Sequence, residues 1–398
     1  MKDLKHIHFF EKLLEQADNT LVRQAKEEGK AAVGYTCYYV PEALLNCGNA
    51  FSVRLSAPNT GSLDISQYYM TSFICGYARA LFERAFEGGY KFLDFYASSD
   101  TCQQMVRVVE NLHELELVDN PRFDYGIIDA PMKVEPHTLK LYTEQIKLRF
   151  LKPLEENFGV DFSDESVREA VRMHNEMCDI FSEMCELRKA DNPVITPREF
   201  HIISIASYTC PTYLILPYLR ETLDELKKRE PDPVNRWRAR VAVIGSELDD
   251  YAFSEILENN RCYVVADRYC FGSFPGRQRI ELSEGEDALT QVCRCYLETN
   301  QCPRFMSAEK IKERKDYAKR LCEQYRADGI IYEQAKFCDF WGYERMLNVQ
   351  IMREEYGIPT IGVDREYVVR GSGQLATRVQ AFVESLEIKK IQEGEKKQ

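Results

Sequence analysis

Cysteine is the residue type through which this chain could do the most chemistry, because its thiolate binds soft metals and iron–sulfur clusters and carries redox reactions. The 398 residues include 14 cysteines but only 6 histidines, and no Cys-x-x-Cys pair occurs. An ordinary zinc module is therefore disfavoured, and a cysteine site would have to be assembled from residues far apart in the sequence. Packing is the alternative for each cysteine, because a free cysteine is often buried like a small hydrophobe.

Three cysteines occupy positions that suit a site at the edge of a parallel sheet. Cys102 follows the strand-like segment FLDFYASS, and Cys338 holds the equivalent position after DGIIYEQ. Cys75 lies in the crossover before FLDFYASS, and the glycine that follows it allows a bulky group to approach the backbone. In open parallel sheets, ligands bind beyond the carboxyl ends of the strands, near the point where the strand order reverses. Three thiolates from separate elements suit an iron–sulfur cluster, and an iron without a protein thiolate could act as a Lewis acid.

The remaining cysteines are weaker candidates. Cys178 and Cys185 lie one heptad apart on a helical stripe, and Cys295 falls on a different helix face from Cys293. Core packing explains most of the others as well. The cysteines that are weaker candidates for a ligand site are Cys178, Cys185, Cys210, Cys262, Cys270, Cys293, Cys295 and Cys302.

Two segments of the chain alternate short apolar strands with helices, and this pattern predicts parallel sheets covered by helices on both faces. The predicted strands are 31–36, 51–56, 92–99 and 125–131 in the first segment, and 240–245, 262–267, 328–334 and 358–364 in the second. Helical patterns include roughly 65–87, 103–115, 286–297, 307–326 and 373–387. The polar segment from residue 388 onward is expected to fray.

The predicted fold class is therefore α/β, with two doubly wound parallel-sheet domains and a helical domain between them. Residues 151–235 lack convincing strands, and apolar residues recur in them at helical spacing. The expected divisions are an N-terminal α/β domain over 1–150, a helical domain and linker over 151–235, and a C-terminal α/β domain over 236–398.

Composition and motifs argue against several classes of function. The net charge is −12, which argues against nucleic acid as the main partner. The chain has no long apolar run for a transmembrane helix and no apolar core of a signal peptide at its start, so we expect a cytoplasmic protein without disulfides. The segment VIGSELDD lacks the later glycines of a dinucleotide fingerprint, and no GxxxxGK[ST] loop occurs. Neither nicotinamide nor ATP binding is expected in this chain.

Several segments, in this order, give the chain a resemblance to a known family: VGYTCYYVPEAL, ICGYAR, SSDTC, DGIIYEQAKFCD, YGIPTIGVDREY and GQLATRVQAFVE. The chain resembles the 2-hydroxyacyl-CoA dehydratase subunits, such as the D-component of 2-hydroxyglutaryl-CoA dehydratase, which share a superfamily with the benzoyl-CoA reductase subunits. The resemblance spans most of the chain and implies two related α/β domains plus a helical domain. It also implies that Cys75, Cys102 and Cys338 ligate a [4Fe–4S] cluster where the domains meet.

The resemblance implies an iron–sulfur-dependent lyase that eliminates water from an (R)-2-hydroxyacyl-CoA to give the 2-enoyl-CoA. The β-proton of such a substrate is not acidic enough for ordinary base catalysis. One-electron reduction of the thioester carbonyl to a ketyl radical would expel the 2-hydroxyl and make loss of that proton feasible. The implied partners are a homologous second subunit in a heterodimer, or a second copy in a homodimer, and a separate ATP-dependent activator protein that delivers the electron.

The chain departs from the family pattern after its first two strands. Members with the active-site cluster carry a serine near the position of Cys37 and a Tyr-Pro-Glu-Asn stretch after the second strand, whereas this chain reads YTCYYVP and RLSAPN. Cys37, Ser56 and Asn59 are therefore the predicted catalytic or substrate-lining residues. The rival hypotheses are a low-potential reductase of the same superfamily, including a type with a larger double-cubane cluster, and a non-catalytic partner subunit whose cysteines only pack.

Overall fold

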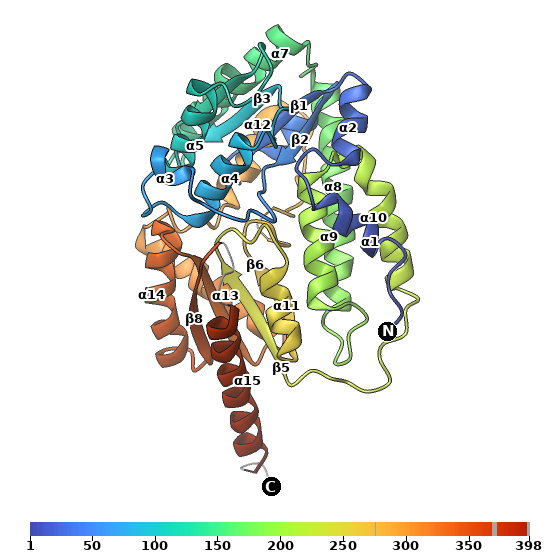
Figure 1. Ribbon diagram of the computed structural model, residues 1–398, viewed down its shortest axis with the longest axis vertical. Coiled ribbons are helices and arrows are strands. Elements are labelled where there is room, and N and C mark those ends of the chain that lie inside the picture. The colour runs from blue at the N-terminus through green and yellow to red at the C-terminus, as the bar shows by residue number, and fades with distance from the viewer. Residues whose placement is uncertain (275, 368–371, 396–398) are drawn as a thin grey trace.

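The computed structural model describes residues 1–274, 276–367 and 372–395. These residues form two four-stranded sheets in which every strand pairing is parallel (Figure 1). The first sheet has the order β2-β1-β3-β4, with β1 (Ala31–Tyr35), β2 (Ala50–Arg54), β3 (Phe95–Ser99) and β4 (Asp124–Ile128). The second has the order β6-β5-β7-β8, with β5 (Ala239–Gly245), β6 (Cys262–Arg268), β7 (Gly329–Ala335) and β8 (Thr360–Arg365). The predicted α/β class with parallel sheets is confirmed.

The strands are apolar along most of their length because helices cover both faces of each sheet. On the first sheet, α4 (Gly76–Phe86) and α5 (Gln103–Glu114) pack on one face, and η1 (Glu42–Asn46), α6 (Pro136–Ile146) and the π-helix η2 (Lys147–Leu151) pack on the other. On the second sheet, α11 (Ala252–Asn259) and α15 (Ser372–Glu395) share one face, while α13 (Ala308–Tyr325) and α14 (Asp339–Glu354) share the other.

The strand order reverses between β1 and β3 in the first sheet and between β5 and β7 in the second. Loops that leave the carboxyl ends of these strands are the expected place for a ligand in an open α/β sheet. The first pair of loops carries Cys37 and Cys102, and the second carries Glu247 and Cys338.

Three helices between the two sheets in the sequence, α8 (Asp164–Leu187), α9 (Pro197–Thr209) and α10 (Thr212–Leu226), pack against one another. Helix α9 is buried on nearly all sides and contacts β2 of the first sheet and β6 of the second. Its sequence, PREFHIISIASYT, has too little polar surface for a solvent-facing helix, and its central position follows from that. The other helices are α1 (Ile7–Leu13), α2 (Thr20–Glu27), α3 (Ser66–Tyr69), α7 (Lys152–Phe158) and α12 (Ala288–Glu298).

The prediction of one helical stretch over roughly 65–87 is wrong. Helix α3 ends at Tyr69, and α4 begins only at Gly76, with Cys75 as its N-cap. At the start of α4, Tyr367 packs directly over Gly76, where an added Cβ would come within 2.5 Å of the tyrosine Cβ.

The polar segment from residue 388 onward, which was expected to fray, is helical as far as residue 395. Helix α15 continues to that residue. Lys390 forms an ion pair with Asp328 at 2.6 Å, and Lys389 donates to the carbonyl of Gly357, so the polar end of the helix is anchored to the second domain. Residues 396–398 lie outside the described part. None of the helices in the described ranges is both long and apolar enough to span a bilayer.

Candidate functional site

Cys75, Cys102 and Cys338 share one structural role, since each is the N-cap residue of a helix. They cap α4, α5 and α14 respectively. The sulfur of Cys75 accepts the N–H of Ala78 at 3.5 Å, whereas the side chains of Cys102 and Cys338 accept no capping hydrogen bond. A helix N-terminus carries a partial positive charge, so these positions favour a thiolate or another negative group.

The three thiols also act on one another electrostatically. Burial, and then the neighbouring Cys102, raises the pKa of Cys75 to about 12. Burial raises the pKa of Cys102 to about 11. The pKa of Cys338 is raised well above its ordinary value by burial, with Cys75 and Cys102 adding to the effect. The structure therefore brings these thiols, from both sheet domains, into one neighbourhood, and their role as ligands stays a prediction.

A single side chain, Gln104 in the first turn of α5, connects the segments that carry the three cysteines. Its carbonyl oxygen accepts the backbone N–H of Cys75 at 2.8 Å. Its amide nitrogen donates to the carbonyl of Phe337 at 3.1 Å and to Asp339 at 3.2 Å, on either side of Cys338. The starts of α4, α5 and α14 are thereby fixed relative to one another.

The donor set consists of thiols alone, which is the ligand type that holds iron–sulfur clusters. Across the described ranges, no group of three or more His, Cys, Asp or Glu side chains is arranged to hold one metal ion. A cubane cluster presents a different iron to each thiolate, so its cysteines stand further apart than the ligands of one ion. Buried thiols with raised pKa values lose their protons outright when they coordinate a metal.

A second group of thiols, Cys37, Cys270 and Cys302, adjoins the first. Cys37 follows β1, and its sulfur lies 3.3 Å from the hydroxyl of Thr101, the residue before Cys102. The pKa of Cys270 is raised by burial and Glu247, and further by Cys302 and Cys37. Burial and Cys37 raise the pKa of Cys302 to about 12. Cys37 also contributes to the raised pKa of Cys102, and this interaction links the two groups.

Accessibility separates most of these cysteines from those that fill the core, although Cys75 of the first group is buried. The half-buried cysteines are Cys37, Cys102, Cys270, Cys295, Cys302 and Cys338. All of these except Cys295 belong to the two thiol groups. The cysteines outside the groups, Cys295 excepted, are buried, as predicted for Cys178, Cys185 and Cys210. Sequence reasoning passed over Cys270 and Cys302, although Cys270 follows the carboxyl end of β6, where a ligand site is expected.

A buried arginine, Arg54 at the end of β2, joins the carboxyl ends of both sheets beside these thiols. It is 1% exposed and donates to the carbonyls of Thr36 and Cys270 and, at 3.1 Å, to the carboxylate of Glu247. Glu247 is the residue that sequence reasoning missed at the second switch point. Burial raises its pKa, while Arg54 opposes that shift.

The other two predicted catalytic residues differ in exposure. Ser56 is buried, and its backbone carbonyl accepts the hydroxyl of Tyr90 at 2.9 Å. Asn59 is exposed, with a left-handed φ of 60°, and lines a cavity in which the described lining residues include no cysteine. Cys338 instead lines a surface groove of 700 Å³, together with Lys336, Asp339 and neighbouring residues.

Comparison with known proteins finds one family match and several named relatives. The family described as 2-hydroxyglutaryl-CoA dehydratase, D-component, matches residues 37–386. The (R)-phenyllactyl-CoA dehydratase beta subunit of Clostridium sporogenes is 24% identical, over 96% of this chain and 99% of its own length. The beta subunit of (R)-2-hydroxyglutaryl-CoA dehydratase from Acidaminococcus fermentans is 22% identical, over 92% and 95%. The lactoyl-CoA dehydratase subunit beta of Anaerotignum propionicum is 23% identical, over 90% and 93%. Because the family match spans most of the sequence, the chain belongs to the 2-hydroxyglutaryl-CoA dehydratase D-component family.

Proposed function

We propose that this chain is the cluster-bearing subunit of a 2-hydroxyacyl-CoA dehydratase, which eliminates water from an (R)-2-hydroxyacyl-CoA to give the 2-enoyl-CoA. Cys75, Cys102 and Cys338 would hold a [4Fe–4S] cluster. The observation that carries the proposal is the convergence of these three cysteines, each at the N-cap position of a helix, in a chain whose relatives are acyl-CoA dehydratase subunits.

When bound, the cluster would supply one electron at low potential and an iron position open to the substrate oxygen. The residues of the chain supply the surroundings. The N-termini of α4, α5 and α14 would stabilise negative charge at the thiolates. The groove beside Cys338 gives a thioester a path to this position from the surface. Cys37 and Thr101, which lie in contact, would hydrogen-bond a substrate hydroxyl.

The proposed assembly includes further proteins. The relatives are named as beta subunits, which supports a homologous second subunit, with a homodimer as the alternative. A separate ATP-dependent activator would deliver the electron, since this chain has no phosphate-binding loop. We place the protein in the cytoplasm, where thiols stay reduced.

The test is the iron and acid-labile sulfide content of anaerobically purified protein. We expect about four irons per chain, lost together with the visible absorbance in Cys338→Ala. The matched control is Cys322→Ala, because Cys322 is a buried core cysteine of the same domain. If Cys338→Ala keeps the iron and absorbance of the control, the three-cysteine assignment is wrong.

A second candidate function is a low-potential reductase of the same superfamily that carries a larger, double-cubane cluster. The observation in its favour is the second thiol group, Cys37, Cys270 and Cys302, which adjoins the first through Cys37 and Cys102. This candidate predicts about eight irons per chain and a loss of roughly half of them in Cys270→Ala. The dehydratase with one cubane predicts that Cys270→Ala keeps all its iron.

A further inference from the structure

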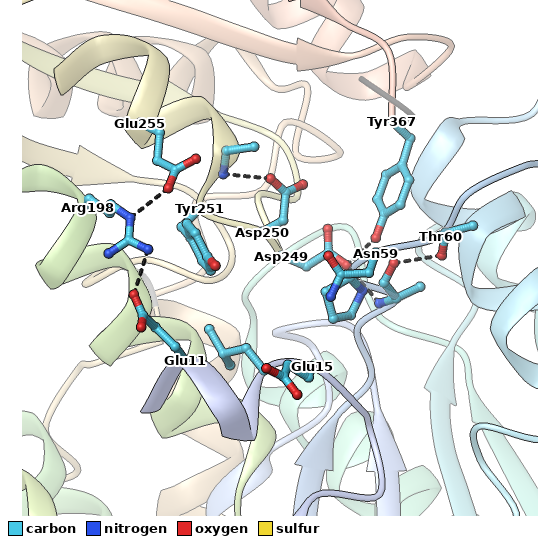
Figure 2. Close-up of a pocket in the computed structure, with 14 residues that line it drawn as sticks. Glu11, Glu15, Asn59, Thr60, Arg198, Asp249, Asp250, Tyr251, Glu255 and Tyr367 are labelled. Atoms are coloured by element: carbon cyan, nitrogen blue, oxygen red, sulfur yellow. Dashed lines mark hydrogen bonds and ion pairs between the residues drawn. The ribbon is translucent and has the colours of Figure 1, made fainter. Parts of the chain in front are cut away.

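A separate cavity of 480 Å³ lies where the first helix and both sheet domains meet (Figure 2). Its volume falls in the range of small-molecule sites, roughly 300 to 1,000 Å³. Residues from the end of α1, the loop after β2, the start of α9 and the loop before α11 line it. The proposed dehydration uses none of the charged groups in this cavity.

The lining of this cavity is strongly acidic. Five carboxylate side chains contribute to it: Glu11, Glu15, Asp249, Asp250 and Glu255. Arg198 is the sole cationic side chain among the described lining residues, and it is already bound by Glu11 and Glu255, at 2.6 Å each. Asp250 lies 3.5 Å from Arg365, outside the cavity. The cavity therefore holds more negative charge than its own cation neutralises.

Asp249, at the inner side of the cavity, has an oxygen that lacks a partner. The side chain is 1% exposed, and one oxygen accepts the Tyr367 hydroxyl at 2.5 Å and the N–H of Ala57 at 3.0 Å. Figure 2 shows the Tyr367 hydroxyl turned toward it. The other oxygen, Oδ1, has no hydrogen-bond partner anywhere in the described structure. Buried polar atoms nearly always form a hydrogen bond, so a bound group that donates one to this oxygen is expected.

We propose that this cavity binds a small aliphatic primary amine, whose ammonium donates to Asp249 Oδ1. An ammonium has three donors and no acceptor, which matches a lining of carboxylates. Leu14, Pro58 and Ala252 give the cavity apolar walls for an alkyl chain, and the exposed Glu15 can receive a second ammonium at the rim. A metal ion fits less well, because no three potential ligands in the described chain are arranged around one point. The proposal is independent of the dehydratase function.

The test is isothermal titration of the anaerobically purified protein with 1,4-diaminobutane. We expect saturable binding with a dissociation constant below about 1 mM, weakened about tenfold or more in Asp249→Asn. Butan-1-ol, which lacks the ammonium, should not bind. The control Asp119→Asn removes an exposed carboxylate elsewhere on the surface and should bind like the wild type. Absence of saturable binding by the wild type, or equal affinity in Asp249→Asn, would overturn the proposal.

A second variant guards against a folding defect, because Asp249 also holds Tyr367 and Ala57. Ala252→Leu fills part of the cavity from the first position of α11 and leaves every carboxylate in place. Leucine is a good helix former, so the helix should be preserved. We expect Ala252→Leu to bind the diamine about tenfold more weakly. If it binds as tightly as the wild type, the amine does not occupy this cavity.

Discussion

The Gln104 side chain offers a direct test of how the cysteine site is held together. Replacing it with methionine keeps its length but removes its hydrogen bonds to Cys75, Phe337 and Asp339. The bonds to the two backbone groups are each worth about 1 kcal/mol, and the third, which is exposed, contributes little. We therefore expect Gln104→Met to lower the free energy of unfolding by about 2 kcal/mol.

Two measurements separate this effect from a general loss of stability. In native-state hydrogen exchange, the amide of Cys75 should exchange faster, because it loses its acceptor while the rest of α4 keeps its helical bonds. In urea unfolding followed by fluorescence, Trp341 reports on the start of α14. Gln104→Glu keeps the acceptor for Cys75 and loses both donors, so it should protect the Cys75 amide but still destabilise the protein.

Gln103→Met is the matched control, because Gln103 is the exposed neighbour on the same helix. It should leave both measurements unchanged. If the Gln103 and Gln104 variants exchange and unfold alike, Gln104 does not hold the cysteine segments together. In protein purified with iron, Gln104→Met should also lose its visible absorbance in air faster than the control.

Three further predictions concern the buried framework. Arg314 and Glu344 form a buried ion pair through two hydrogen bonds of 2.8 and 3.0 Å. Arg314→Leu alone leaves Glu344 buried without its partner and should lower the free energy of unfolding in urea by about 3 to 5 kcal/mol. Adding Glu344→Leu should restore most of that lost stability. Burial lowers the pKa of His201 to about 4, whereas a histidine in the unfolded chain has a pKa of about 6.5. The unfolded state therefore binds the proton first as the pH falls. The free energy of unfolding should drop by up to about 3 kcal/mol between these two pKa values. His201→Gln should flatten this part of the curve in a pH series of urea unfolding. Gly76→Ala places a Cβ against Tyr367 and should cost about 1 to 3 kcal/mol by thermal unfolding, with no such cost for alanine at the open position Gly373.

The strands could be predicted from the sequence because their signals are local. Each observed strand overlaps its predicted segment, since a short apolar run bounded by polar or turn residues is typical of a strand covered on both faces. The same local reasoning failed over residues 65–87. Helix α4 begins only after Cys75, and its first residue, Gly76, packs against Tyr367 from the far end of the chain.

Only the part of the candidate site with a local sequence signal could be predicted. Cys102 and Cys338 could be singled out because each directly follows a strand that borders a switch point. Cys270 and Cys302 were set aside, because their nearness to Cys37 depends on how the two sheets dock and leaves no pattern in the sequence. Asp249 was missed for a similar reason. Its segment, VIGSELDD, was judged only as a nucleotide-binding motif.

The bond between Gln104 and Phe337 spans 233 residues, and this separation bears on the order of events during synthesis. Each sheet draws its strands from one continuous part of the chain, so the first can form while the second is still on the ribosome. Until the second sheet docks, Cys75 and Cys102 have no Cys338 beside them. Closing so long a loop carries an entropic cost and comes late in folding. The nascent chain therefore cannot offer all three thiols until translation is nearly complete, and pulse-labelling of thiols on stalled chains would show when they come together.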